Sequence, residues 1–274
     1  MAISRVIRET TMLKQTLNNS ILTLTLNRPE VRNALNAELI GTLTQAVLKA
    51  HQSDDVRVVV LRGEGNHFSA GADLNWMLSM KSESMETNVN DAKALAELMT
   101  TLNFCRKPVI AVVQGAVMGG GVGLTACADI AIAQDNAMFA LSETRLGLTP
   151  ATISPFVVNA IGRRQARRYM LTGERFDAVT ALQLGLVHEV APWERIDTLI
   201  HDFCDALKQG GPDSHRKIKK LLHDVSERPL NDELMENLAW RIANQRIGAE
   251  GQEGIRAFLE KRAAAWVETE DDNQ

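Results

Sequence analysis

The sequence predicts an α/β fold in which a strand-rich body is followed by a helical C-terminal region. Apolar runs that fit buried strands alternate with helical patterns through the first half of the chain. From Pro155 onward helical patterns dominate, and Gly210-Gly211-Pro212 is the clearest break. This rhythm is typical of repeated ββα or βαβ units with right-handed crossovers. We expect residues 1–205 to form the body and residues 206–274 the helical region, with a frayed acidic end after Val267.

Short local patterns define the expected elements. Residues 21–26, ILTLTL, alternate leucine with threonine, which fits a strand with one buried face. Valine-rich runs bounded by Gly or Pro fit fully buried strands. Asn36 is suited to cap a helix that runs to about His51. The expected strands are residues 21–26, 58–61, 109–113 and 130–133, and the expected helices are residues 36–51, 91–104, 124–127, 163–171, 178–184, 193–208 and 213–223, with a last one from Leu230.

The composition argues against several classes of protein. Of the 274 residues, 45% are hydrophobic, so a sizeable core is expected. The formal net charge of −4 argues against bulk attraction to nucleic acid or to an anionic membrane. No apolar run approaches the roughly 18 residues of a membrane helix, and the segment MAISRVIRETTMLKQ lacks the apolar core of a secretory signal. We expect a cytoplasmic protein with no membrane partner.

Metal, disulfide and dinucleotide sites are not indicated. The three cysteines, Cys105, Cys127 and Cys204, form no CxxC pair, and their number is odd. The six histidines show no HxxxH spacing. A GxGxxG turn after the first strand is also missing, which argues against a Rossmann site. We therefore expect no metal ion and reduced thiols.

Two small-residue loops are the candidate site. The loop 69–73, SAGAD, and the loop 119–121, GGG, each follow a valine-rich strand, and the second also opens a helix. Glycines let a ligand approach the backbone closely. The free N–H groups and partial positive charge of a helix N-terminus suit an anion or a developing oxyanion. Each loop alone is equally compatible with tight packing, whereas the pair together indicates a site.

Several motifs follow one another at characteristic spacings along nearly the whole chain. They are Asn27-Arg28-Pro29, Asn33-Ala34-Leu35-Asn36, FSAGADL at 68–74, KPVIA at 107–111, GAVMGGG at 115–121, Ala128-Asp129-Ile130, Phe139 with Glu143, LGLTP at 146–150 and GQEGIRAFLEK at 251–261. In order and spacing these motifs resemble the crotonase (enoyl-CoA hydratase-isomerase) family. Further features are DLNWM with Met80, the VGL after the glycines and Asn90-Asp91-Ala92. On these features, the closest resemblance within the family is to the bacterial methylglutaconyl-CoA hydratase group.

The resemblance implies a fold, a substrate and an assembly. The fold would be the crotonase (ClpP-like) spiral of ββα units with a helical C-terminal trimerisation region. The substrate would be an acyl-CoA thioester. Coenzyme A is then part of the substrate, and no separate cofactor is expected. The assembly would be a homotrimer or a dimer of trimers.

The resemblance also implies roles for particular residues. The backbone amides of Ala72 and Gly120 would form an oxyanion hole for the thioester oxygen, and Glu143 would be the acid/base. Without the resemblance, an exposed glutamate at a helix start would be the simpler interpretation of Glu143. Lys261 would lie near the CoA phosphates, although a solvated helix face is the simpler role. The implied substrate or CoA contacts are Val31, Arg32, Ala70, Ala72, Asp73, Leu74, Asn75, Gly120 and Lys261.

One position departs from the family pattern. The first glutamate of the two-glutamate hydratases would fall at residue 123, and this chain has Gly123 there. Either Glu143 acts alone, or Ser142 or Thr149 helps to position the water. In the methylglutaconyl group the substrate has a second carboxylate, for which Arg145 is a candidate partner, although a surface salt bridge is the simpler role. Trp76, Met77 and Met80 fit either helix packing or an acyl pocket.

Three functions therefore remain open. The first is a hydratase for a branched or glutaconyl-type enoyl-CoA, such as 3-methylglutaconyl-CoA. The second is an enoyl-CoA isomerase, for which one carboxylate suffices. The third is RNA binding through the basic groups 163–168 and 217–220, against which the net charge of −4 argues.

Overall fold

The computed structural model describes residues 5–9 and 11–267. The chain divides into two compact units, one of residues up to His201 and one from Asp202 onward. The acidic end at 268–274, for which the sequence predicts fraying, lies outside the described residues.

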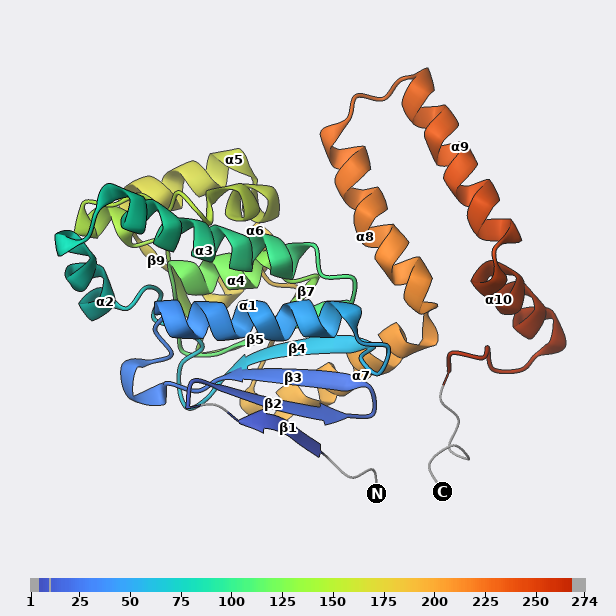
Figure 1. The fold of residues 1–274 in the computed structure, drawn as a ribbon, viewed down its shortest axis with the longest axis horizontal. Coiled ribbons are helices and arrows are strands. Elements are labelled where there is room, and N and C mark those ends of the chain that lie inside the picture. Colours follow the sequence, from blue (N-terminus) through green and yellow to red (C-terminus); the bar gives the residue numbers. More distant parts are fainter. Residues whose placement is uncertain (1–4, 10, 268–274) are drawn as a thin grey trace. The chain divides into compact units, whose positions relative to one another are not determined.

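A mixed sheet forms the centre of the first unit (Figure 1). Its order in the described part of the chain is β1-β2-β3-β4-β5-β7-β10; β1, β2 and β3 pair antiparallel, and the pairs from β3 to β10 are parallel. The four expected strands are confirmed as β3, β4, β5 and β7. The strands are β1 (Arg5–Glu9), β2 (Leu13–Asn18), β3 (Ile21–Leu26), β4 (Val58–Gly63), β5 (Val109–Val113), β7 (Ile130–Gln134) and β10 (Glu189–Ala191).

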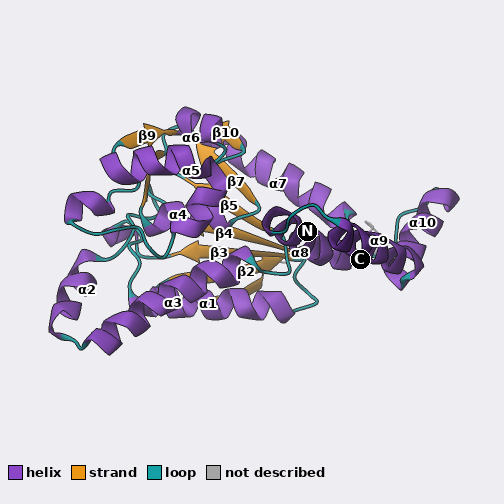
Figure 2. Ribbon diagram, turned by 90° about the horizontal axis from the view of Figure 1, so that it is seen from above, coloured by secondary structure: helices purple, strands orange, loops and turns teal. Residues whose placement is uncertain are grey.

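Helices α1 (Ala37–Gln52) and α3 (Met85–Asn103) pack against each other over one face of this sheet (Figures 1 and 2). The Asn36 side chain accepts a hydrogen bond from the Leu39 amide, so the expected cap of α1 is confirmed. Every residue of β5 is buried, as expected for a strand covered on both faces. The centre of the sheet is therefore a rigid support for the loops that leave its strand ends.

A second, three-stranded sheet stands beside the glycine loop. It contains β6 (Ala116–Met118), β8 (Met138–Ala140) and β9 (Arg175–Asp177), in the order β6-β8-β9 among the described residues. The sequence alone did not predict these strands, because three-residue strands have no usable periodicity. The other elements of this unit are 3-10 helices η1 (Pro29–Val31), η2 (Met80–Ser82) and η3 (Glu143–Leu146), and helices α2 (Leu74–Ser79), α4 (Gly120–Cys127), α5 (Ser154–Thr172) and α6 (Ala178–Leu184).

The C-terminal unit is helical where it is described, as expected. Helix α7 (Trp193–Gln209) runs across the boundary between the units, and α8 (Pro212–Glu227), α9 (Asp232–Ile247) and α10 (Ala249–Glu260) follow. Glu250 caps α8 through the amides of Asp213 and Ser214. The ion pair between Arg241 and Asp224 links α9 to α8.

Several helix boundaries differ from the expected ones. Helix α4 begins at Gly120 rather than residue 124. Helix α3 begins at Met85 rather than near residue 91, because the Ser84 hydroxyl caps it through the Thr87 amide. Helix α5 begins at Ser154 rather than 163, because the chain is helical on both sides of a break at Gly162, whose φ is +74°. The helix expected from Leu230 is two helices, separated at Gly248.

Candidate active site

The loop that carries Ala72 is fixed by a bridge to Leu35. The Leu35 amide donates to the Gly71 carbonyl at 2.7 Å, and the Asp73 amide donates to the Leu35 carbonyl at 2.9 Å. Because Leu35 makes both bonds of this parallel bridge, the N–H of Ala72 points away from it. That N–H donates no hydrogen bond within residues 5–9 and 11–267, and Ala72 is exposed. It is available to a ligand.

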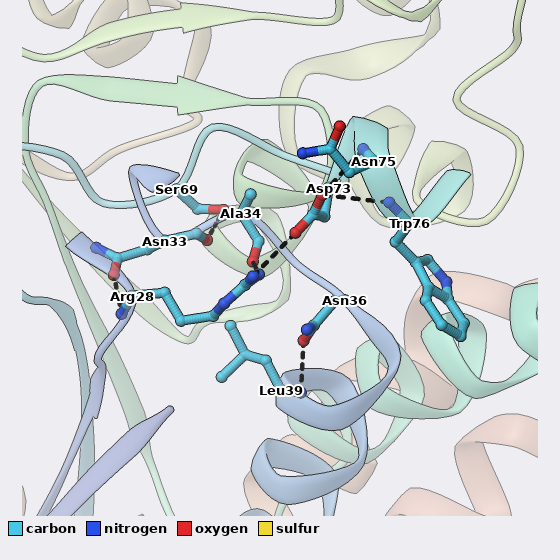
Figure 3. Close-up of polar contacts among 9 residues, drawn as sticks. All are labelled: Arg28, Asn33, Ala34, Asn36, Leu39, Ser69, Asp73, Asn75 and Trp76. Carbon is cyan, nitrogen blue, oxygen red and sulfur yellow. Dashed lines mark hydrogen bonds and ion pairs between the residues drawn. The ribbon is translucent and has the colours of Figure 1, made fainter. Parts of the chain in front are cut away.

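Asp73 holds the same loop through its side chain (Figure 3). Its carboxylate accepts from Arg28 Nη2 at 2.9 Å and caps α2 through the amides of Asn75 and Trp76. Burial alone would raise the pKa of Asp73, but the Arg28 and backbone hydrogen bonds outweigh it and lower that pKa. The side chains of Asp73 and Arg28 are each only 13% exposed. This carboxylate is therefore engaged within the protein.

Buried Asn33 ties this loop to its neighbours. Its side-chain amide donates to the Glu64 carbonyl at 2.9 Å and to the His67 carbonyl at 2.7 Å. Its backbone carbonyl accepts a hydrogen bond from the Ser69 hydroxyl at 2.9 Å. Its φ is +54°, in the left-handed region that Asn tolerates better than most residues. Asn33 therefore sets the path of the chain into the SAGAD loop (Figure 3).

The glycine loop presents the second amide. Gly119 has φ +47°, and its own amide donates to the Ala140 carbonyl at 2.9 Å. Gly120 is the first residue of α4, where a helix leaves its amides without internal partners. Within the described residues the Gly120 N–H donates no hydrogen bond. The helix N-terminus also contributes a partial positive charge at this amide.

The two loops are joined to each other through their backbones. Ser69 bridges Val117, with the Ser69 amide donating to the Ala116 carbonyl at 3.1 Å and the Met118 amide donating to the Ser69 carbonyl at 2.9 Å. A Cβ atom at Gly71 would lie 2.8 Å from the Met118 carbonyl oxygen. Glycine at this position therefore permits the close approach that brings the Ala72 and Gly120 loops together.

Glu143 lies against the glycine loop. A Cβ atom at Gly119 would be 2.8 Å from the Glu143 Oε1 atom, so the carboxylate touches the residue next to Gly120. Its Oε2 atom is buried without a hydrogen-bond partner in the described part of the chain. Burial raises the pKa of Glu143 above its ordinary value. A partly desolvated carboxylate with one oxygen free of hydrogen bonds, beside free amides, is well placed to move protons.

Gly123, which stands where the two-glutamate hydratases would have a glutamate, is closely covered by other side chains. A Cβ atom at Gly123 would lie 2.5 Å from Ile153 Cγ2 and 3.2 Å from Met99 Sδ. Both of these side chains are fully or almost fully buried, Ile153 at 2% exposure and Met99 at 0%. Ile153 thus fills the space that any side chain at position 123 would need.

The remaining predicted residues are more scattered. Val31 and exposed Arg32 belong to the segment between β3 and α1, and the Arg32 carbonyl joins it to the SAGAD loop by accepting from the Ala70 amide at 2.8 Å. Leu74 and Asn75 start α2 and are both exposed. Lys261 ends α10 in the helical unit and is exposed. Contacts of these residues with CoA stay predictions.

Comparison with known proteins assigns the family. A model of the enoyl-CoA hydratase/isomerase family matches residues 16–269. The chain belongs to this family. It has 32% identity with 2,3-dehydroadipyl-CoA hydratase of Escherichia coli over 244 residues, which are 88% of the chain and 93% of the relative. It has 30% identity with trans-2-decenoyl-[acyl-carrier-protein] isomerase of Streptococcus mutans over 256 residues, 89% and 94% of the two chains.

Solved structures confirm the crotonase fold of this family member. An enoyl-CoA hydratase from Shewanella pealeana superimposes with a TM-score of 0.90 at 41% identity, covering 93% of this chain and 96% of that one. As a family member, the chain is an enzyme of the enoyl-CoA hydratase type. Among the described residues, no helix is long and apolar enough to cross a membrane, and no group of His, Cys, Asp and Glu could hold a metal ion.

Sequence reasoning missed the residues that support the loops. Arg28 and Asn33 stand in two of the family motifs, but their partners are distant in sequence. Asp73 lies 45 positions after Arg28, and His67 lies 34 positions after Asn33. Ile153 had no signal, because its contact with Gly123 depends on how α5 packs on α4.

Proposed function

We propose that this enzyme is a hydratase that adds water to an α,β-unsaturated acyl-CoA thioester. The observation that carries the proposal is the grouping of two unbonded amides, on the Ala72 and Gly120 loops, with the half-buried Glu143 carboxylate, whose Oε2 atom has no hydrogen-bond partner in the described part of the chain. Coenzyme A enters as part of the substrate, and the reaction needs no separate cofactor.

Glu143 moves the same proton twice in the proposed reaction. Its carboxylate takes a proton from water while the water oxygen bonds to C3, and the electron pair of the double bond moves onto the thioester oxygen. The amides of Ala72 and Gly120 hold the resulting enolate, and each such donor is worth about 3 kcal/mol in the transition state. The protonated Glu143 then returns its proton to C2, which completes the hydration.

We further propose a branched or glutaconyl-type acyl group, such as that of 3-methylglutaconyl-CoA. The second carboxylate of such a group would favour a cation near the site. Arg145 is two residues from Glu143, is exposed, and makes no ion pair within the described ranges. These properties support Arg145 as that cation.

Loss of ultraviolet absorbance from the conjugated thioester tests the proposal. With 3-methylglutaconyl-CoA and crotonyl-CoA compared side by side, we expect rapid loss with the glutaconyl substrate. Loss with crotonyl-CoA alone would overturn the substrate proposal and keep the hydratase. Glu143→Gln should abolish turnover while the thioester still binds; turnover near wild type would overturn the assignment of the base.

Isomerisation of an enoyl-CoA is the second candidate. It is favoured by the packing of Ile153 on Gly123, which leaves no room there for a second carboxylate. In this reaction Glu143 takes a proton from C2 of a 3-enoyl-CoA and returns it to C4, which yields the 2-enoyl isomer. Rapid conjugation of a 3-enoyl-CoA without hydration of the product would decide for the isomerase.

We also propose self-association into a homotrimer or a dimer of trimers, in the cytoplasm. We propose that residues 1–205 form the body and that residues 206–274 form the helical region. This helical region exposes many large apolar side chains. Burying them against another copy would remove apolar surface from water. Sedimentation of the full chain measures the state, and a monomer at micromolar concentration would contradict the proposal. The exposed side chains include Leu230, Met235, Trp240, Ile242, Ile247, Phe258 and Leu259.

A further inference from the structure

His67 joins the segments from which the two amide loops start. It lies between β4 and the SAGAD loop, and its Nδ1 atom accepts a hydrogen bond from the Ala116 amide at 3.0 Å. Ala116 begins β6, which leads into the glycine loop. A Cβ atom at Gly115 would lie 2.5 Å from the same nitrogen, so the imidazole fits closely onto the turn between β5 and β6.

The imidazole takes the place of a backbone acceptor between these segments. Ser69 pairs with Val117, so a regular parallel ladder would direct the Ala116 amide to the carbonyl of His67. That carbonyl instead accepts from the Asn33 side chain at 2.7 Å. The side chain of His67 therefore supplies the acceptor that its own backbone does not.

This hydrogen bond affects both free amides. Ala116 stands four residues before Gly120, and His67 stands five residues before Ala72. Without the bond, and within the described residues, β6 keeps two backbone hydrogen bonds to the SAGAD loop, and both end at Ser69. Loss of the His67 acceptor would therefore let β6, and with it the Gly120 amide, turn about that one residue relative to the Ala72 amide.

The neutral imidazole is the form that can make this bond. Because Nδ1 accepts from an amide, the proton of the neutral ring is on Nε2. An imidazolium carries a proton on each nitrogen and cannot accept a hydrogen bond. Protonation of His67 would therefore set its own N–H against the N–H of Ala116.

The surroundings of His67 favour this neutral form. Burial and the positive charge of Arg32, on the segment between β3 and α1, lower the pKa of the imidazole below its ordinary value. The Glu64 carboxylate, three residues earlier, pairs with Lys14 at 3.2 Å. The turn between β7 and β8 brings the neutral side chain of Asn136 to the turn between β5 and β6. These neighbours supply no carboxylate that would stabilise an imidazolium.

We propose that His67 is a positioning residue whose neutral imidazole holds the Gly120 amide in register with the Ala72 amide. The inference rests on the proposed function, because the two amides matter as the donors to one thioester oxygen. Both donors must be aimed at the same point to share that oxygen. A misplacement of about 1 Å can lower a rate about 100-fold. Removal of the acceptor and protonation of the acceptor should therefore have the same effect on turnover.

Two variants of His67 separate the acceptor from the ring. In His67→Asn the side-chain oxygen can occupy the place of Nδ1 and accept from Ala116, whereas His67→Ala leaves that amide without an acceptor. Near neutral pH we expect kcat to fall about 100-fold in the Ala variant, with KM little changed, and to stay close to wild type in the Asn variant. Rates are measured with whichever of crotonyl-CoA, 3-methylglutaconyl-CoA and 3-butenoyl-CoA the wild type turns over. Equal kcat values in the two variants would overturn the role of His67.

His188 offers a matched control. Its Nδ1 atom accepts from the Ala131 amide, also at 3.0 Å, near the amino end of β7. The amide loops follow the carboxyl ends of β4 and β5, to which β7 runs parallel, so His188 lies at the opposite edge of the sheet. His188→Ala should leave kcat unchanged. A loss as large as that of His67→Ala would show that removal of any such acceptor slows the enzyme, which contradicts a positioning role for His67.

The pH profile tests the neutral form and keeps the test decisive if the Ala variant does not fold. Glu143 titrates in both the wild type and His67→Asn, whereas the imidazole titrates in the wild type alone. As the pH falls below about 6.5, the wild type should lose kcat more steeply than His67→Asn. Profiles that coincide down to the pH at which the proteins unfold would overturn the requirement for a neutral imidazole.

Amide hydrogen exchange separates failure of the inference from failure of the proposed function, because it needs no substrate. Mass spectrometry of the peptide 114–121 should show faster exchange in His67→Ala than in the wild type and His67→Asn. If the wild type turns over none of the three thioesters, the proposed function fails, and exchange still decides the His67 contact. If the wild type is active and neither exchange nor kcat distinguishes Ala from Asn, only the role of His67 fails.

Discussion

The two loops that present the free amides are held in place by opposite means. The Ala72 loop depends on side chains that reach across it, above all the Arg28–Asp73 ion pair and the Ser69–Asn33 hydrogen bond. The Gly120 loop depends on side chains that are missing, because Gly119 lies directly on the Glu143 carboxylate. Substitutions that remove supporting side chains should therefore disturb the Ala72 loop, whereas substitutions that add atoms to a glycine should disturb the Gly120 loop.

The largest expected effect is from Gly119→Ala. A Cβ atom there would lie 2.8 Å from Glu143 Oε1, on a residue with φ +47°. We expect kcat to fall by about 100-fold or more, as for loss of an oxyanion donor, because the carboxylate and the Gly120 amide must both shift. Steady-state kinetics with crotonyl-CoA and 3-methylglutaconyl-CoA measure the change.

Gly162→Ala is the matched control for this prediction. Gly162 has φ +74°, but a Cβ atom there meets nothing within 4 Å. It should cost stability through backbone strain and leave kcat unchanged. Equal losses of kcat in the two variants would show that strain, rather than contact with Glu143, is responsible.

Arg28→Met tests the Ala72 loop by removal. It leaves the largely buried Asp73 charge unpaired, so the free energy of unfolding should fall by about 3–5 kcal/mol. Lys14→Met breaks an ion pair whose side chains are 37% and 42% exposed, and should cost no more than about 1 kcal/mol. Urea unfolding measures both, and similar losses would contradict the structural role given to Arg28.

The pH dependence of stability should come partly from Asp73. Its pKa in the folded protein is lowered, so its contribution is present above its unfolded value and is lost as the pH falls through the folded value. Stability should therefore drop below about pH 4. In Asp73→Asn this part of the drop should disappear. If the Asp73→Asn variant and the wild type lose stability equally steeply between about pH 2 and 4, carboxylates other than Asp73 cause the loss.

The smallest expected effect is from Asn36→Ala. The Asn36 side chain caps α1 beside the Ala72 loop but contacts neither amide. We expect a loss of about 1 kcal/mol of stability with kcat unchanged. Asn231→Ala removes the corresponding cap of α9 in the helical unit and is the matched control. A large fall in kcat for Asn36→Ala alone would show that the start of α1 also positions the loop.

Local chemistry explains which features were predictable from sequence. The alternation in residues 21–26 and the capping residue Asn36 act within a few positions, and both predictions are confirmed. Ala72, Gly120 and Glu143 were chosen from the family motifs, and their roles stay predictions. The three-stranded sheet, the Arg28–Asp73 pair and the contact of Ile153 with Gly123 join distant parts of the chain. Such contacts depend on packing that no local pattern records.

The partnerless Oε2 atom of Glu143 has a thermodynamic consequence for the fold itself. Because burial raises its pKa, the ionised carboxylate at neutral pH is less favourable in the folded chain than in the unfolded one. A neutral amide at this position removes that penalty. The Glu143→Gln protein, which we expect to be inactive, should therefore melt at a higher temperature than the wild type, and the proposed acid/base would then be kept at a cost in stability.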